Sequence, residues 1–495
     1  MAHRCQALTG KGKRCKKKAL PNEKFCKEHL KQRVYETFGK KRPTRPLYKR
    51  VEFLVPVAMA LAICGWQTYL ALRQPTKQEA QHIAGDAFHR TLEELGITPP
   101  KTYEEIRKAI GKSCIEVGEA VCEKIRLAGE ALDGGRYGEA QDSYEALVQI
   151  FADVLELRYN LAVSYFYDNK WDEAAEEARE AIQIKPDDAD AHNVLGGVLS
   201  SQGKQAEAIK EFHEALAHEP DFAFAHNNLG VALYREGRFQ QAIAALTRVV
   251  ELRPDFAAGF SNLCVALKAE GNLQEAAEAC RAAIRIDPKS AVACNNLGGV
   301  LTEQDSLPQA VKMYKKATEL SPGYAEAYNN LGNALKKQGK LEDAIEAYRT
   351  AIEIKPKLAE AHGGLANVLR RQERLGDAVK EYREVVRLKP DDAEAYYNLG
   401  TGLSLADSLD EGVTMLRKAV LLKPEYPEAY NNLGSALAKQ DSLEGAIEAF
   451  GHAIRLEPDH VDAHANLALA YQNQDQLEEA MQEWFQVVRI DSNDA

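Results

Sequence analysis

Hydrophobic positions in this chain recur every 34 residues from residue 121 to residue 494, which gives eleven units. The unit 325–358 shows the pattern most clearly. Within it, Leu331, Leu335 and Tyr348 have the spacing of residues that fill the gap between two packed helices, called helix A and helix B below. The pattern therefore predicts eleven helix pairs and an all-α fold for this part of the chain.

Small residues and helix-ending residues indicate where each unit turns. Gly332 and Ala344 are small because helix A and helix B would cross closely there, and Gly339 can take the left-handed conformation that ends helix A. Pro356 ends helix B. The small residue of helix B recurs in every unit as Ala140, Ala174, Ala208, Ala242, Ala276, Ala310, Ala344, Ala378, Gly412, Ala446 and Ala480.

This repeated pattern resembles the tetratricopeptide repeat family over roughly three quarters of the chain. The resemblance implies a right-handed α-solenoid of helix pairs, in which helix A of each pair lines a concave surface. It also implies a scaffold that binds proteins or extended peptides. The repeats are accompanied by no nucleotide-binding loop, catalytic triad or metallohydrolase signature, so we expect no enzymatic activity.

The sixth position of helix A is asparagine in eight of the ten units from the second onward. Asparagine is a mediocre helix former, so its recurrence needs an explanation. A carboxamide offers a donor and an acceptor together, and a row of them can pair with the main chain of an extended peptide. Alternatively, the asparagines cap or bridge neighbouring repeats. The row comprises Asn160, Asn228, Asn262, Asn296, Asn330, Asn398, Asn432 and Asn466, with Val194 and Gly364 as interruptions.

The row is similar to the asparagine ladder of the tetratricopeptide superhelix in O-linked N-acetylglucosamine transferases. That resemblance implies a groove that holds extended peptides by their main chain. Such an enzyme would need a catalytic domain after residue 495, so a non-catalytic fragment of a glycosyltransferase is an alternative hypothesis.

Two other recurring side chains in the repeats predict packing rather than chemistry. Four histidines occupy the fourth position of helix A, where five other units carry an aromatic residue or cysteine: His192, His226, His362 and His464. Cys264 replaces the helix A glycine of its unit, and Cys280 replaces the helix B aromatic residue. We expect both cysteines to fill the core.

An apolar run at residues 53–72 has about the length needed to cross a bilayer and contains no charged residue. Together with its flanks it predicts a transmembrane helix at 51–73, a basic linker at 36–50 and a helical stalk at 74–120. Basic residues before the run predict a cytoplasmic N-terminus, with the repeats on the opposite side of a single-pass membrane protein. A buried or peripheral amphipathic helix is the alternative.

The first 50 residues contain 17 Lys or Arg against 3 Asp or Glu, whereas the whole chain has a formal net charge of −11. Residues 1–35 also contain Cys5, Cys15, Cys26 and His29. Three thiols and an imidazole form a closed tetrahedral shell for structural Zn²⁺, which would supply the folding energy of so small a segment. A disordered basic tail with incidental cysteines is the alternative interpretation.

The spacing of these four residues resembles the WRC-type zinc motif of plant regulatory proteins, and also short Cys-rich basic segments of bacterial proteins. The triplet that names the WRC motif is Trp-Arg-Cys, whereas this chain has Lys13, Arg14 and Cys15. A nucleic-acid-associated regulator led by the zinc motif is therefore an alternative function, which we rank below protein binding because basic charge beside a membrane helix has a simpler explanation.

The last unit departs from the others in helix B, where Phe485 occupies a position that is polar or glycine in the earlier units. Trp484 lies beside it. Repeat arrays normally end in a polar face, so this unit predicts an exposed apolar patch that serves as a homodimer contact or partner site.

Overall fold

The computed structural model describes residues 100–110 and 119–491. This part of the chain folds into 23 helices and contains no strand. The helices are α4 (Tyr103–Ile110), α6 (Glu119–Asp133), α7 (Tyr137–Val148), α8 (Leu155–Tyr167), α9 (Trp171–Ile184), α10 (Ala189–Ser201), α11 (Gln205–His218), α12 (Ala223–Arg235), α13 (Phe239–Leu252), α14 (Ala257–Ala269), α15 (Leu273–Ile286), α16 (Ala291–Glu303), α17 (Leu307–Leu320), α18 (Ala325–Lys337), α19 (Leu341–Ile354), α20 (Ala359–Arg371), α21 (Leu375–Leu388), α22 (Ala393–Leu405), α23 (Leu409–Leu422), α24 (Pro427–Lys439), α25 (Leu443–Leu456), α26 (Val461–Asn473) and α27 (Leu477–Asp491).

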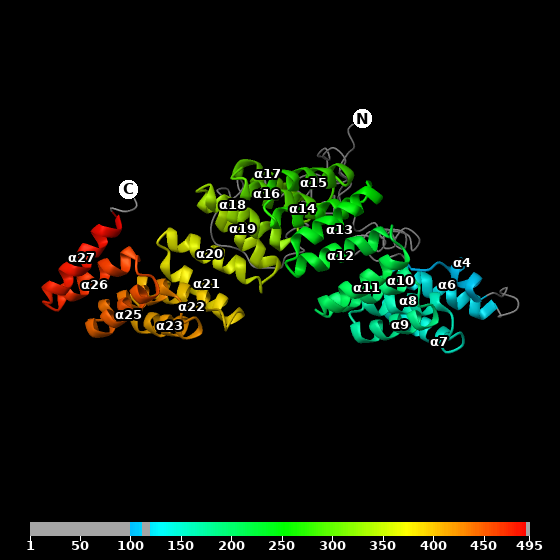
Figure 1. Ribbon diagram of the computed structural model, residues 1–495, viewed down its shortest axis with the longest axis horizontal. Coiled ribbons are helices and arrows are strands. Elements are labelled where there is room, and N and C mark those ends of the chain that lie inside the picture. Colours follow the sequence, from blue (N-terminus) through cyan, green and yellow to red (C-terminus); the bar gives the residue numbers. More distant parts are fainter. Residues whose placement is uncertain (1–99, 111–118, 492–495) are drawn as a thin grey trace, which may run out of the picture. The chain divides into compact units, whose positions relative to one another are not determined.

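From α6 onward the helices form eleven A and B pairs, as the 34-residue period predicts (Figure 1). Each B helix packs on the A helix of its own unit and on the A helix of the next unit. Successive A helices, such as α14 and α16, also touch, whereas successive B helices make at most weak contacts. Helices on the inner side of a curved array lie closer together, so the A helices form the concave face of the solenoid.

The glycine of helix A is required by the aromatic ring of helix B. A Cβ atom on Gly332 would lie 2.7 Å from Cε1 of Tyr348, which is a fully buried ring. Gly298 with Tyr314, and Gly434 with Phe450, repeat this contact in other units. The predicted close crossing of the two helices is therefore confirmed, and the absent side chain makes the space for the ring.

Every unit turns between its helices through one residue with a positive φ angle. Gly339 has φ 76°, which confirms its predicted left-handed conformation. Six units use a residue other than glycine at this place, and Glu373 is the bulkiest of them. The eleven residues are Gly135, Asn169, Gly203, Gly237, Gly271, Asp305, Gly339, Glu373, Asp407, Asp441 and Asp475.

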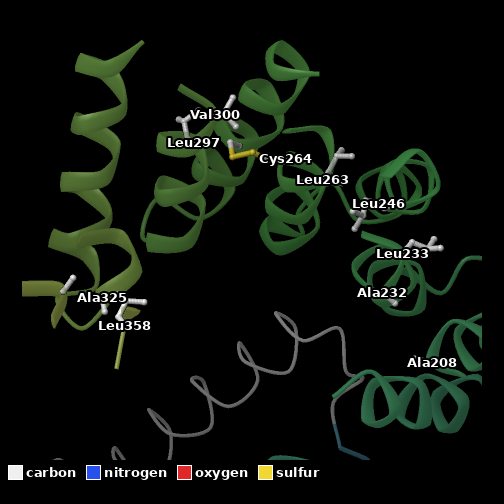
Figure 2. Close-up of a cluster of buried hydrophobic side chains, with 14 of the residues drawn as sticks. Ala208, Ala232, Leu233, Leu246, Leu263, Cys264, Leu297, Val300, Ala325 and Leu358 are labelled. Atoms are coloured by element: carbon white, nitrogen blue, oxygen red, sulfur yellow. A yellow bond between two sulfur atoms is a disulfide. The ribbon is translucent and has the colours of Figure 1, made fainter. Parts of the chain in front are cut away.

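Cys264 and Cys280 are bonded to each other by a disulfide, with their Cα atoms 5.3 Å apart. The expectation that they are simple core fillers was therefore incomplete: both are fully buried, but they join α14 to α15 covalently. They occupy the positions at which other units have the helix A glycine and the helix B ring. Those two residues are in contact. Figure 2 shows Cys264 in the apolar core with Leu263 of its own helix and with Leu297 and Val300 of α16.

Histidines of the fourth column link neighbouring units by hydrogen bonds. The Nδ1 atom of His192 lies 2.8 Å from Oε2 of Glu211, and its Nε2 atom lies 3.1 Å from the carbonyl oxygen of Pro186 in the preceding unit. His362 and His464 make the same pair of contacts in their units. The predicted packing column is confirmed, with added hydrogen bonds between repeats.

Helix α27 exposes the apolar residues that the sequence singles out. Phe485 is 67% exposed, and Met481 and Val488 are exposed to a similar degree. Trp484 is partly exposed beside them. The expected apolar patch is thus present on the last unit, while its role as a homodimer contact stays a prediction.

The expected membrane localisation needs correction. Across residues 100–110 and 119–491, no helix combines the length and the apolar character needed to cross a membrane. The run that motivated the expectation, residues 51–73, lies outside the described residues. We therefore withdraw the single-pass localisation. The candidate zinc ligands Cys5, Cys15, Cys26 and His29 also lie outside the described residues, so the Zn²⁺ site stays a prediction.

Candidate functional site: the asparagine row of the concave face

The eight asparagines of the row lie on eight different A helices, one on each of α8, α12, α14, α16, α18, α22, α24 and α26. Because the A helices form the concave face, the row follows that face from unit to unit. Asn160 is fully buried and Asn228 nearly so, whereas the other six are half-buried. Half-buried amides in a groove are available to a ligand as well as to the protein.

Asn160 forms hydrogen bonds with the main chain of an upstream segment of the same protein. The backbone N–H of Lys101 donates to Oδ1 of Asn160 at 2.7 Å, and Nδ2 of Asn160 donates to the carbonyl oxygen of Lys101 at 2.8 Å. Both polar atoms of the carboxamide are thus used on a single residue of the main chain. A carboxamide can pair in this way with a main-chain N–H and C=O because it carries a donor and an acceptor together.

The segment at Lys101 also makes other contacts with the A helices. The Lys101 ammonium forms an ion pair with Asp190 on α10 and lies 5.0 Å from the centre of the Tyr159 ring. Burial lowers the pKa of Lys101, but the neighbouring Asp190 carboxylate outweighs this effect and leaves the pKa above its ordinary value. Ile106 of α4 is buried to 1% exposure. Part of the predicted stalk therefore packs on the repeats.

The N-terminus of α4 is closed by a capping box of Thr102 and Glu105. The backbone N–H of Thr102 donates to Oε2 of Glu105 at 2.7 Å, and the backbone N–H of Glu105 donates to Oγ1 of Thr102 at 3.3 Å. These bonds lower the pKa of Glu105. The cap fixes the start of α4 at Tyr103, and so fixes the position of the Lys101 peptide unit to which Asn160 bonds.

Six other asparagines of the row bridge neighbouring repeats, which was the alternative interpretation of the pattern. Each donates its Nδ2 to the side chain at the fifth position of the preceding unit. For example, Nδ2 of Asn262 donates to Oδ1 of Asn227 at 2.9 Å. The remaining pairs are Asn228 with Asn193, Asn296 with Ser261, Asn330 with Asn295, Asn432 with Tyr397, and Asn466 with Asn431.

This bridging decides what each half-buried asparagine can offer to a ligand. In Asn262, Asn296 and Asn330 one N–H of the Nδ2 group donates to the neighbouring repeat, and the Oδ1 atom is available as an acceptor. At the equivalent place before Asn398 the chain has Gly363, which has no side chain to accept such a bond. The signal that sequence reasoning missed is the run of Asn or Ser at the fifth position of successive units.

A pocket of about 460 Å³ opens on the middle of the row, between α12, α14, α16 and α18. Asn296 and Asn330 line it together with three lysines, Lys268, Lys336 and Lys337. Glu303 is the one acidic residue of the lining, and its carboxylate lies 3.1 Å from Nζ of Lys268. The pocket therefore combines acceptor oxygens with a net positive charge, although the chain as a whole is acidic.

Two family models match the repeats. A model described as tetratricopeptide repeat matches residues 125–189, 159–221, 194–255 and 228–291. A second model, described as the C-terminal domain of cilia and flagella-associated protein 70, matches residues 270–470. No curated protein matches the chain closely enough to be called a relative.

Solved structures with similar helices include YrrB, described as a TPR protein with an unusual peptide-binding site, which is 27% identical and covers 38% of this chain and 96% of its own, with a TM-score of 0.35. MamA from Desulfovibrio magneticus RS-1 is 25% identical over 34% of this chain and 96% of its own, with a TM-score of 0.33. The Cut9–Hcn1 hetero-tetramer of the APC/C is 16% identical over 86% of this chain and 95% of its own, with a TM-score of 0.41. The helix pairs, the 34-residue period and the family-model matches together show that the repeated part of this chain is a tetratricopeptide repeat solenoid.

Proposed function

We propose that this protein is a non-catalytic scaffold that binds extended polypeptide segments of partner proteins along the asparagine row of its concave face. The observation that carries the proposal is the pair of hydrogen bonds between Asn160 and the main chain of Lys101. One member of the row is thus hydrogen-bonded to a main-chain peptide unit, and that unit belongs to the same chain.

The bridged asparagines act differently from Asn160. Because one N–H of the Nδ2 group is used between repeats, the Oδ1 atoms of Asn262 and Asn330 face the bound segment and accept hydrogen bonds from its backbone N–H groups. Such bonds ignore the side chains of the ligand, so the row gives affinity for extended chains with little sequence preference. Proline lacks the backbone N–H, so proline-rich segments fit this row poorly.

This mode of binding is the one that the asparagine ladder of O-linked N-acetylglucosamine transferases suggests, without their chemistry. The alternative of a regulator led by the Zn²⁺ motif depends on Cys5, Cys15, Cys26 and His29, which the structure does not describe. Zinc content of the purified protein, before and after Cys26→Ser, tests that motif separately. A stoichiometric ion that is lost in the variant would support it, and an absence of zinc in both would remove it.

The proposal is tested with 12-residue peptides selected from a random library for binding to the full chain. Asn262→Ala and Asn330→Ala remove both the bridge and the acceptor oxygen. The matched controls, Asn227→Ala and Asn295→Ala, remove the same two bridges from the other side and keep the row intact. We expect the first double variant to lose about tenfold in affinity and the control to lose far less. Equal losses of affinity in the two double variants would show that the asparagine row stabilises the repeats and does not bind the peptide.

We also propose that the apolar patch of α27 joins two copies of the chain. Phe485, Met481 and Val488 are exposed together on α27, the B helix of the last unit, and Phe485 stands where the earlier units carry polar residues or glycine. Sedimentation of the full chain tests this idea: a dimer should become a monomer with Phe485→Glu. A monomer in both proteins would contradict it.

A further inference from the structure

Helix α20 lacks the asparagine bridges that join the other A helices around it. In the described array between α10 and α26, a bridge from the sixth position of one unit to the fifth position of the unit before crosses six of the eight junctions. The two exceptions lie on either side of α20, whose fifth and sixth positions are Gly363 and Gly364. Within this range, α20 is therefore the A helix with no such bridge on either side.

The ring of Tyr348 explains the missing bridge between α18 and α20. A Cβ atom on Gly364 would lie 2.4 Å from Cε1 of Tyr348, so an asparagine does not fit at this position. The Oδ1 atom of Asn329, which would accept the bridge, is buried and has no hydrogen-bond partner in the described part of the chain. A buried acceptor without a donor is unfavourable, so this junction is weaker than a bridged one.

The junction between α20 and α22 has lost helix contact as well as its bridge. Gly363 has no side chain to accept a bond from Asn398. Among successive A helices from α8 to α26, α20 and α22 are the pair that makes at most weak contact. Glycine alone is not the reason, because α16 contains the pair Gly298 and Gly299 and keeps its bridges and its contacts on both sides. The fifth position is therefore the one that matters.

The B helix holds the same junction together from the other side. Helix α21 packs on α22, where a Cβ atom on Gly402 would lie 3.2 Å from Cδ2 of the Tyr382 ring. Arg383 on α21 also forms an ion pair with Glu411 on α23 at 2.6 Å. One side of the junction is thus fastened while the A-helix side is not. An array with this asymmetry bends about the fastened side at low cost.

From this arrangement we infer that the junction between α20 and α22 is a hinge in the solenoid. The helices α8 to α21 form one arm and the helices α22 to α27 form the other. Rotation about the packing of α21 on α22 changes the separation of α20 and α22, and so changes the curvature of the concave face at this point. The inference goes beyond the proposed peptide binding and does not depend on it.

Gly363 offers a way to close the hinge with one substitution. A Cβ atom on Gly363 would lie 3.8 Å from Cγ2 of Val385, which is ordinary contact distance, so a side chain fits there. Gly363→Asn places an acceptor at the fifth position, as Asn295 does for Asn330 at 3.0 Å, and gives Asn398 its bridge. Gly363→Ala is the matched control. It also removes the conformational freedom of glycine from the helix, but it supplies no acceptor.

Distances between pairs of nitroxide labels on the full chain test the hinge by double electron–electron resonance. The labels are attached to genetically encoded keto amino acids, because the chain contains nine cysteines. Labels at Glu353 and Leu421 lie on either side of the hinge, at the same exposed position two units apart. Labels at Arg285 and Glu353 have the same spacing across two bridged junctions. We expect the first distance distribution to be about twice as wide as the second.

The two variants then test whether the missing bridge causes the motion. Gly363→Asn should narrow the distribution between Glu353 and Leu421 to about the width of the control pair, whereas Gly363→Ala should leave it wide. Equal widths for the two label pairs in the otherwise unchanged chain would overturn the hinge, and this comparison does not depend on the folding of any Gly363 variant. Equal widths in Gly363→Asn and Gly363→Ala would overturn the missing bridge as its cause.

Discussion

Asn262 on α14 donates its Nδ2 to Oδ1 of Asn227 on α12 at 2.9 Å, from one repeat to the one before it. A half-buried residue of the concave face and a stabilising contact between units are therefore the same side chain. This bond accounts for an asparagine in the middle of a helix, where its propensity is unfavourable. It also fixes the direction in which the carboxamide faces the groove.

Substitution of Asn160 should release the segment around Lys101 from the groove. Asn160→Ala removes both hydrogen bonds to the Lys101 peptide unit, so we expect the Lys101 amide to exchange with solvent at least about tenfold faster. Hydrogen exchange followed by mass spectrometry measures this. Asn272→Ala, in a turn between α14 and α15, is the control and should leave the exchange unchanged. Unchanged exchange of the Lys101 amide in Asn160→Ala would mean that the two hydrogen bonds of Asn160 do not hold the segment.

The crossing of helix A and helix B should not tolerate one added methyl group. Gly332→Ala places a Cβ atom 2.7 Å from the buried Tyr348 ring, so the ring must move, and we expect a loss of about 1–3 kcal/mol. Urea denaturation measures the loss. Gly323→Ala adds the same methyl group where nothing lies within 4 Å, and it should cost far less. Similar losses in the two variants would argue against the packing account.

His192 should make the stability of the third unit depend on pH. Both partners of its ring, the Glu211 carboxylate and the Pro186 carbonyl, accept hydrogen bonds, so both ring nitrogens must carry a proton to donate. The bond to Glu211 raises the pKa of His192 against the opposing effect of burial. A folded pKa above the unfolded value stabilises fully below the unfolded pKa, and the contribution is lost as the pH rises through the folded pKa.

Thermal unfolding between pH 6 and pH 8 tests this dependence. The wild-type chain should unfold at a lower temperature at pH 8 than at pH 6, and His192→Gln, which cannot titrate, should show a smaller difference. An equal difference in both proteins would exclude His192 as the source.

The disulfide between Cys264 and Cys280 should stabilise the unit that forms one wall of the pocket. The bond closes a loop with a sequence separation of 16 residues, for which we expect about 3 kcal/mol. The variant Cys264→Ala with Cys280→Ala should therefore unfold earlier than the wild type without reductant. In dithiothreitol most of that difference should vanish, because the wild type loses the bond too. A difference that reductant leaves unchanged would mean that the cysteines act by packing alone.

The repeat architecture was predictable because small residues and ring positions recur in columns that only a helix pair explains. Gly332, Tyr348 and Gly339 occupy the environments that their columns indicate. The disulfide was less visible, although Cys264 and Cys280 stand where a glycine and a ring touch in other units. The contact between the glycine position and the ring position shows that two cysteines there are close enough to bond. The expectation of simple core fillers did not take that contact into account.

The chemistry of the asparagine row was only half predictable. The sequence indicates a column of carboxamides, but the direction of each one depends on the fifth position of the preceding unit, which helix packing brings within reach. The hydrogen bonds between Asn160 and the main chain of Lys101 depend on the packing of α4 against the repeats, and no periodic pattern in the sequence predicts them. The combination of positive charge and amide groups in the pocket likewise arises from lysines and asparagines of separate repeats, which come together only in the folded array.

The most direct measurement of the central claim replaces backbone N–H groups of a bound peptide. Each amide of a selected 12-residue ligand is N-methylated in turn, and each side chain is separately changed to alanine. If the row accepts hydrogen bonds from the main chain, individual N-methyl groups should weaken binding to the full chain about tenfold or more, while most alanine changes should cost little. Strong dependence on the side chains with tolerance of N-methylation would contradict main-chain recognition by the asparagine row.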